Sequence, residues 1–163
     1  MAPEVDLDLI FCMTAKKYNL EKLQLKSIAI VESSLNPRAF RFEQGFWDLY
    51  LKNNPEWKDR DPQEVSSSRG LFQLMYTTAG SLGFPKDGPG EDLFNPVYNT
   101  ELAAKLIRQL LDKNYGWWDV VLSCYNSGQG GNPAPDGSIR SIAYINKVRK
   151  TYWNLRKTEE NCD

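Results

Sequence analysis

The chain has 163 residues, 41% of them hydrophobic, which is enough for one domain with a substantial core. Lys and Arg number 20 against 21 Asp and Glu, a balance that argues against nucleic-acid binding. The sequence contains no His, which excludes His-based catalytic triads and His metal sites and leaves acid–base chemistry to Glu, Asp, Tyr, Lys or Cys.

The first half of the chain predicts helices separated by polar segments. Apolar residues recur at helical spacing over about 6–18 and over 20–33, and the second segment is apolar on most sides, as a central helix would be. Asn36-Pro37 is expected to end it. The aromatic stretch 41–53 predicts another helix, whereas the polar stretch 54–68 predicts a surface loop.

The second half predicts four more helices. The first is short, over 71–82, with Gly83 at a left-handed cap. Asn95-Pro96 is typical of a helix start and opens a long helix. Helical spacing resumes over 118–125, a loop follows at 127–133, and a last helix is expected over about 138–155, with an apolar face of Ile142, Ile145, Val148 and Tyr152. Few segments alternate as strands do, so the expected fold class is mainly α.

The three cysteines are odd in number and lack CxxC spacing, which predicts neither a zinc site nor a complete disulfide framework. We expect Cys12 and Cys124 to pack in the core and Cys162, in a polar tail, to be free. No stretch approaches ~18 consecutive apolar residues, so no membrane insertion is expected. The N-terminus lacks the basic-then-apolar order of a signal peptide.

Glu32 is the most informative residue, because it follows a nearly apolar helical run. Leu25 and Ile28 precede it by seven and four residues and Leu35 follows by three, all on one predicted helix face. A carboxyl group among such neighbours resists ionisation, a property that a general acid needs near neutral pH. The alternative is a solvated charge or a cap partner at a helix end.

Four blocks occur in order along the chain: Glu32-Ser33-Ser34-Leu35-Asn36-Pro37, Ser68-Arg69-Gly70-Leu71-Phe72-Gln73-Leu74-Met75, Cys124-Tyr125-Asn126-Ser127-Gly128 and Ala143-Tyr144-Ile145-Asn146-Lys147-Val148. Together they resemble the soluble lytic transglycosylase (SLT) domain, a lysozyme-like family that cleaves bacterial peptidoglycan. The resemblance implies a lysozyme-like, all-helical single domain over 1–163, in which a central buried helix carries the catalytic Glu. Its core would span about 6–155, with an insertion at about 40–65 and a polar C-terminal tail at 156–163.

The resemblance also implies roles for individual residues. Glu32 would be the sole catalytic acid and base, without metal or cofactor. Substrate contacts are expected for Gln73, Met75, Tyr125, Asn126 and Tyr144. For the family's upstream serine, Ser66, Ser67 and Ser68 compete, and Ser68 is the candidate within the motif. Read from the residues alone, Gln73 could be a surface amide, Tyr125 and Tyr144 core aromatics, and Asn126 part of a helix cap.

Glu43, in the expected insertion, is a candidate second carboxylate or a solvated Glu at a helix start. The implied reaction cleaves the β-1,4 bond between N-acetylmuramic acid and N-acetylglucosamine and forms 1,6-anhydromuramoyl ends. The alternatives are a hydrolase of goose-type lysozyme character, with Glu43 positioning water, and a catalytically silent glycan-binding or virion-structural domain.

The expected partner is the peptidoglycan glycan strand, and a monomer is predicted. The substrate lies outside the bacterial inner membrane, in the periplasm or extracellular space. Because no export signal is visible, we expect delivery by a phage virion, a pore, a secretion system or a removed leader.

Overall fold

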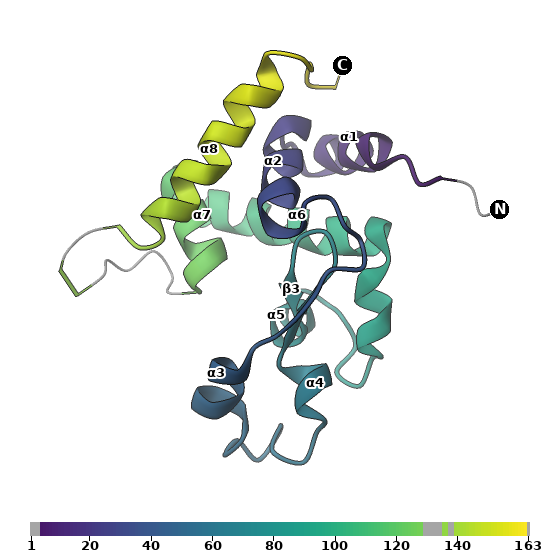
Figure 1. Ribbon diagram of the computed structural model, residues 1–163, viewed down its shortest axis with the longest axis vertical. Helices are drawn as coiled ribbons and strands as arrows, with labels where there is room; N and C mark the ends of the chain where they lie inside the picture. The colour runs from purple at the N-terminus through teal and green to yellow at the C-terminus, as the bar shows by residue number, and fades with distance from the viewer. Residues whose placement is uncertain (1–3, 129–134, 137–138, 163) are drawn as a thin grey trace. The chain divides into compact units, whose positions relative to one another are not determined.

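The computed structural model describes residues 4–128, 135–136 and 139–162 (Figure 1). Over these ranges it is mainly helical, with eight α-helices and a small antiparallel sheet of three strands. The chain forms two compact units, one made of Met1–Val31 with Ala104–Asp163 and the other of Glu32–Ala103. None of the described helices has the length and apolar character needed to cross a membrane.

The first unit contains the helices that the periodicity predicts most clearly. They are α1 (Leu7–Tyr18), α2 (Lys22–Ser33), which ends in the second unit, α6 (Pro96–Lys113), which begins there, α7 (Trp118–Ser127) and α8 (Ile142–Arg156). Asp6 caps α1 by accepting a hydrogen bond from the Leu9 N–H. Asn95 likewise accepts one from the Tyr98 N–H at the start of α6, which confirms the cap predicted at Asn95-Pro96.

The last two helices, α7 and α8, pack side by side and run in roughly opposite directions (Figure 1). Gly128 caps α7 in the left-handed conformation. The last helix is predicted to start at about residue 138, a position that lies outside the described residues. In the structure α8 begins at Ile142. Ile142 is exposed, contrary to expectation, whereas Ile145, Val148 and Tyr152 are buried.

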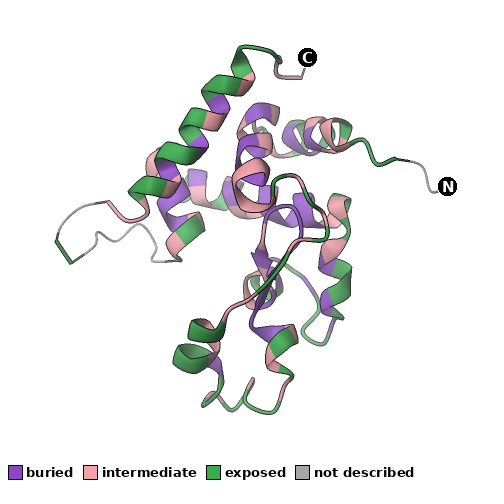
Figure 2. Cartoon of the chain, in the orientation of Figure 1, coloured by how far each residue is buried: buried purple, intermediate pink, exposed green. Residues whose placement is uncertain are grey.

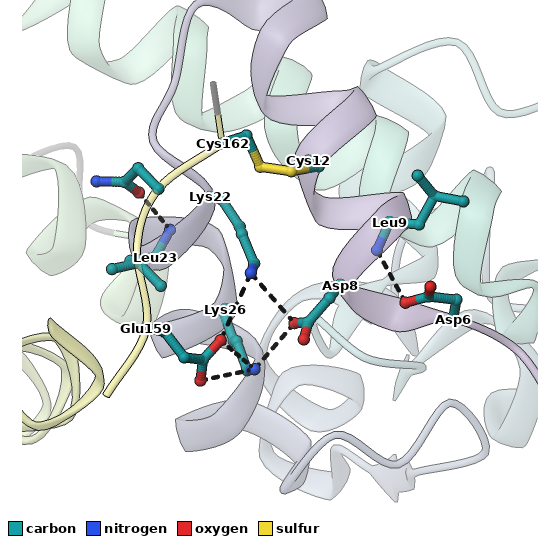
Figure 3. Close-up of a disulfide and its surroundings, with 10 residues drawn as sticks. Asp6, Asp8, Leu9, Cys12, Lys22, Leu23, Lys26, Glu159 and Cys162 are labelled. Carbon is teal, nitrogen blue, oxygen red and sulfur yellow. Dashed lines mark hydrogen bonds and ion pairs between the residues drawn. A yellow bond between two sulfur atoms is a disulfide. The ribbon is translucent and has the colours of Figure 1, made fainter. Parts of the chain in front are cut away.

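A disulfide between Cys12 and Cys162 fastens the C-terminal segment to α1 (Figure 3). The expectations that Cys12 is a core residue and Cys162 is free are therefore wrong. Cys124 is buried as expected. The pairing joins residues 150 positions apart, and three cysteines in a sequence carry no information about which two are neighbours in space.

An ion-pair network lies beside the disulfide (Figure 3). Lys26 Nζ donates to Asp8 Oδ1 at 2.9 Å and to Glu159 Oε1 at 2.8 Å, and Lys22 Nζ lies 3.5 Å from the same Glu159 oxygen. Partial burial opposes the charge of Lys26, but the hydrogen bonds with Glu159 and Asp8 outweigh it and raise its pKa. Asn161 accepts a hydrogen bond from the Leu23 N–H, one of the amides that the first turn of a helix leaves unpaired. The polar tail is thus fixed to α1 and α2.

The second unit contains the sheet, which corrects the all-helical prediction. Strand β1 (Phe40–Phe42) pairs with β2 (Ser67–Arg69), and β2 pairs with β3 (Leu74–Met75), both antiparallel. Strands of two or three residues are too short to produce a recognisable alternating pattern. Figure 2 shows β2 and the turn after it as buried, and these residues form part of the core of this unit.

Short helices replace several predicted segments of this unit. The helix predicted over 41–53 is instead β1, α3 (Gln44–Phe46) and a π-helical turn (Trp47–Leu51). The loop predicted over 54–68 contains α4 (Pro62–Val65) and β2. The helix predicted over 71–82 shrinks to α5 (Tyr76–Ser81), after a turn and β3, and a 3₁₀ turn (Gly90–Phe94) precedes α6. Gly83 has the predicted positive φ, at +111°.

The disulfide predicts a redox-dependent stability. Cross-linking residues 150 positions apart restricts the unfolded chain, so reduction should lower the free energy of unfolding by about 2–4 kcal/mol. Urea unfolding of the wild type with and without a reductant measures this loss. The double variant Cys12→Ser/Cys162→Ser serves as the control. Its urea midpoint should equal that of the reduced wild type and should not change when the reductant is added. A wild type whose midpoint does not respond to reduction would contradict the pairing.

Candidate active site

Glu32 lies in the last turn of α2, where the helix ends at Ser33. Ser34 and Leu35 follow with φ of +53° and +63°, a left-handed pair that cannot continue a right-handed helix. Leu35 is therefore not on the helical face of Glu32, contrary to prediction, although Leu25 and Ile28 are fully buried in the same helix. Asn36 then accepts a hydrogen bond from the Arg38 N–H and directs the chain into β1.

One face of the sheet brings together residues from its three strands. In the register of the strands, Arg41 lies opposite Ser68, and Ser68 lies opposite Met75. Residues directly opposite each other in antiparallel strands share a face. Glu43 follows Arg41 by two positions, so it belongs to the same face.

Glu43 is held by this face rather than by the helix that it precedes. Its Oε1 accepts a hydrogen bond from Ser68 Oγ at 3.2 Å and lies 3.5 Å from Arg41 Nε. Its side chain makes no capping bond to α3 and is only 27% exposed. The interpretation of Glu43 as a solvated residue at a helix start does not fit this geometry.

The three competing serines have different partners. Ser66 Oγ donates to the backbone carbonyl of Glu43, and Ser67 Oγ donates to that of Glu64. Only Ser68 bonds a carboxylate side chain, that of Glu43. Of the three serines, Ser68 is therefore the one whose side chain lies at Glu43, and its contact with substrate stays a prediction.

The charged residues of this face shift the pKa of the Glu32 carboxyl group. Burial raises its pKa from the ordinary 4.5 to about 7, Arg41 opposes the rise and Glu43 adds to it. A group with a pKa of about 7 is present in both protonation states at neutral pH. It can therefore donate a proton and later accept one at little cost.

Gln73 has a structural role that the sequence did not show. Its φ is +49°, and its Nε2 donates to the carbonyls of Ala39 at 3.1 Å and Gly70 at 3.0 Å. Both amide hydrogens are thus used within the protein. If Gln73 contacts a sugar, it does so through Oε1, as the acceptor of an O–H or N–H.

Asn99 organises the same segment from α6 and was missed by the sequence analysis. It is fully buried, its Nδ2 donates to the carbonyls of Arg69 and Leu93, and its Oδ1 accepts from the Phe72 N–H, all at 2.9 Å. Gly70 passes close to it with φ +81°, and a Cβ there would lie 2.4 Å from Asn99 Nδ2. The glycine of the motif is required both by this contact and by its backbone angle.

The remaining predicted site residues belong to the first unit. Tyr125, half-buried, and Asn126, exposed, lie in the last turn of α7, and half-buried Tyr144 lies in the first turn of α8. Because the two helices run in opposite directions, these residues lie at the same end of the pair (Figure 1). Their contacts with substrate remain predictions.

Arg41 is a further residue of the site that the sequence analysis did not identify. Its guanidinium is the cation that opposes the raised pKa of Glu32 and pairs with Glu43. The signal was the pattern Arg41-Phe42-Glu43, which puts both charges on one face once the segment is taken as a strand. Among the residues that the structure describes, no three Cys, Asp or Glu side chains gather as metal ligands would.

The model of the transglycosylase SLT domain matches residues 10–136, which is most of the chain. The chain therefore belongs to the SLT family, whose members are generally lytic transglycosylases that act on the cell wall. No solved structure matches the chain.

Replacing Asn99 tests its organising role. In Asn99→Ala one buried N–H and two buried carbonyls lose their partner, so the free energy of unfolding should fall by at least about 2 kcal/mol. Asn54→Ala is the matched control, because Asn54 makes an exposed turn bond to the Glu56 N–H and should lose less than about 1 kcal/mol. Urea denaturation measures both, and equal losses would contradict the role.

The raised pKa of Glu32 predicts how stability varies with pH. The unfolded chain releases this proton near pH 4.5 and the folded chain near pH 7, so ionisation destabilises the folded state as pH rises between these values. Glu32→Gln removes the effect. Relative to the wild type, the variant should gain up to about 3 kcal/mol between pH 4.5 and pH 8.

Chemical denaturation across this range measures the gain, and using the difference between two pH values cancels any constant effect of the amide. Glu56→Gln, at an exposed site where the carboxylate lies 3.6 Å from Lys86 Nζ, should follow the wild type. A constant offset between Glu32→Gln and the wild type would show that the pKa of Glu32 is ordinary.

Proposed function

We propose that the protein is a peptidoglycan lytic transglycosylase with Glu32 as its acid and base. The observation that carries the proposal is the largely desolvated carboxyl group at the end of α2, with its pKa near 7. Membership of the SLT family supports the reaction class. The proposed substrate is the β-1,4 bond between N-acetylmuramic acid and N-acetylglucosamine.

The first step is cleavage of the glycosidic bond. Protonated Glu32 donates its proton to the bridging oxygen as the bond from that oxygen to the anomeric carbon breaks. The oxocarbenium-like centre is stabilised by the N-acetyl group of the substrate, so no second carboxylate is needed. Glu32 is left as a carboxylate.

The second step closes a ring within the product. The Glu32 carboxylate takes the proton from the C6 hydroxyl of the muramoyl residue, and the C6 oxygen bonds to the anomeric carbon. Glu32 is protonated again, and no water is consumed. A pKa near 7 suits both steps, because neither protonation state is costly at neutral pH.

The neighbours of Glu32 have supporting roles in this proposal. Arg41 limits the rise in the pKa of Glu32, so that the carboxylate needed for the second step remains accessible. Gln73 accepts a hydrogen bond from the substrate through Oε1, while its amide hydrogens hold Ala39 and Gly70. Contacts from Ser68, Met75, Tyr125, Asn126 and Tyr144 are proposed from the motifs.

The second candidate function is hydrolysis, in which Glu43 positions a water molecule. The observation in its favour is that the Glu43 carboxylate is held by Ser68 and Arg41 and contributes to the electrostatic environment of Glu32. In that case water replaces the C6 hydroxyl as the nucleophile. The two reactions differ in their products, since a 1,6-anhydro product is one water lighter than a hydrolytic one.

The proposed setting is the bacterial cell wall, outside the cytoplasm. The Cys12–Cys162 disulfide supports it, because such bonds are typical of oxidising compartments. Delivery by a virion, a pore, a secretion system or a removed leader remains a proposal.

Digestion of purified cell walls by three proteins tests the proposal. The wild type should clear the suspension and release anhydro products, and Glu32→Gln should lower the rate by at least about 10²–10⁴-fold while still binding the walls. Glu43→Gln should be slower than the wild type but should keep the anhydro product. Mass spectrometry identifies the products, and Glu56→Gln is the surface control.

Each other outcome rejects the proposal in a different way. Hydrolytic products that vanish in Glu43→Gln would indicate the hydrolase. A folded wild type that binds walls without clearing them would indicate a glycan-binding or virion-structural domain.

A further inference from the structure

The first unit has a pocket that none of the motifs explains. Its volume is about 340 Å³, within the range of small-ligand sites. Its walls come from the start of α7, the second half of α8 and the first turn of α2. Trp117, Trp118 and Trp153 line it together with Gln24, Asp119 and Arg149.

The pocket leaves aromatic surface open to solvent. Trp117 is 64% exposed and Trp153 57% exposed, although the rings belong to the largest apolar side chains of the protein. Over the described part of the chain, neither indole N–H has a hydrogen-bond partner. Two exposed Trp rings on one pocket are a feature of binding surfaces rather than of an ordinary solvated face.

The polar groups of the pocket are close to neutral overall. Arg149 Nη1 lies 3.2 Å from Asp119 Oδ2, so the two charges compensate each other. Gln24 adds an amide that has no protein partner within residues 4–128, 135–136 and 139–162. A ligand with a strong net charge gains little here, whereas a neutral ligand with hydroxyl and amide groups can use all three side chains.

We propose that this pocket is a second glycan-binding site, which takes a β-1,4-linked chain of N-acetylhexosamines. An equatorially substituted pyranose ring has a flat C–H face, which can lie on an indole ring, and a rim of hydroxyl and acetamido groups, which can bond Asp119, Arg149 and Gln24. The choice of this sugar chain rests on the proposed function.

The pocket is separate from the predicted substrate residues of the same unit. Tyr144 is in the first turn of α8 and Tyr152, another lining residue, is eight positions later, a rise of about 12 Å. On α7, Trp118 begins the helix and Tyr125 lies in its last two turns. A strand held at the pocket would keep the enzyme close to its polymeric substrate and raise the effective concentration of cleavable bonds.

The test uses N-acetylchitotetraose as the probe, on full-length protein carrying Glu32→Gln so that no cleavage occurs. The indole N–H signals of Trp117, Trp118 and Trp153 are followed by NMR during titration, after assignment with single Trp→Phe variants. We expect all three to shift. In Trp117→Ala/Trp153→Ala, binding that is reported by Trp118 should weaken at least tenfold.

Tyr115→Asn is the matched control. Tyr115 is 99% exposed, precedes the pocket in sequence and has a φ of +54°, which Asn tolerates. The affinity of the Tyr115→Asn variant for N-acetylchitotetraose should equal that of the Glu32→Gln parent protein. Because the two replaced Trp residues are more than half exposed, the double variant should keep the fold, and single Trp117→Ala provides a milder second variant.

The inference is overturned if the three signals do not move at millimolar probe, or if the Trp variants bind as the parent does. It is also overturned if they respond to a free stem peptide and not to the sugar. Failure of the proposed function is recognised separately, from wild-type digests that lack anhydro products, and it leaves the NMR result unaffected.

Discussion

The desolvation of one carboxyl group, that of Glu32, is the constraint on which the site depends. Its position near the C-terminal end of α2 adds to the difficulty of ionising it, because the helix dipole is negative there. Arg41 offsets part of this penalty and Glu43 increases it, so the pKa of Glu32 settles near 7 rather than higher. Because Glu32 belongs to a helix rather than to a loop, the backbone that carries its carboxyl group is held by the hydrogen bonds of α2.

The small sheet determines which groups surround that carboxyl. Its strands are short, yet their register puts Arg41, Ser68 and Met75 in one row. Buried hydrogen bonds from Asn99 and a partly buried one from Gln73 to Gly70 hold the turn between β2 and β3, and Gly70 allows the close approach of Asn99. These hydrogen bonds act together with the apolar packing of Leu71 and Phe72, which are both fully buried in the same turn.

The elements that the sequence predicts well are those with local physical signals. The cap at Asn95 and the helical spacing of α1, α2 and α7 involve residues a few positions apart, so a local sequence pattern can predict them. Glu32, Gln73 and Ser68 were identified from the motifs, but their partners were not. The Cys12–Cys162 pair and the contacts of Asn99 with Arg69 join distant residues, and no local pattern encodes such pairs.

Burial raises the pKa of Glu32 and Arg41 lowers it, and this balance bears on whether Glu32 acts alone. A pKa near the working pH makes its two protonation states nearly equal in free energy, so one residue can serve as acid and then as base. Glu43 lies in a different environment, since its carboxylate accepts a hydrogen bond from Ser68 and pairs with Arg41. These contacts suit a group that shapes the field around Glu32 or holds a water molecule. The proposed division of roles thus rests on the different environments of the two carboxyl groups.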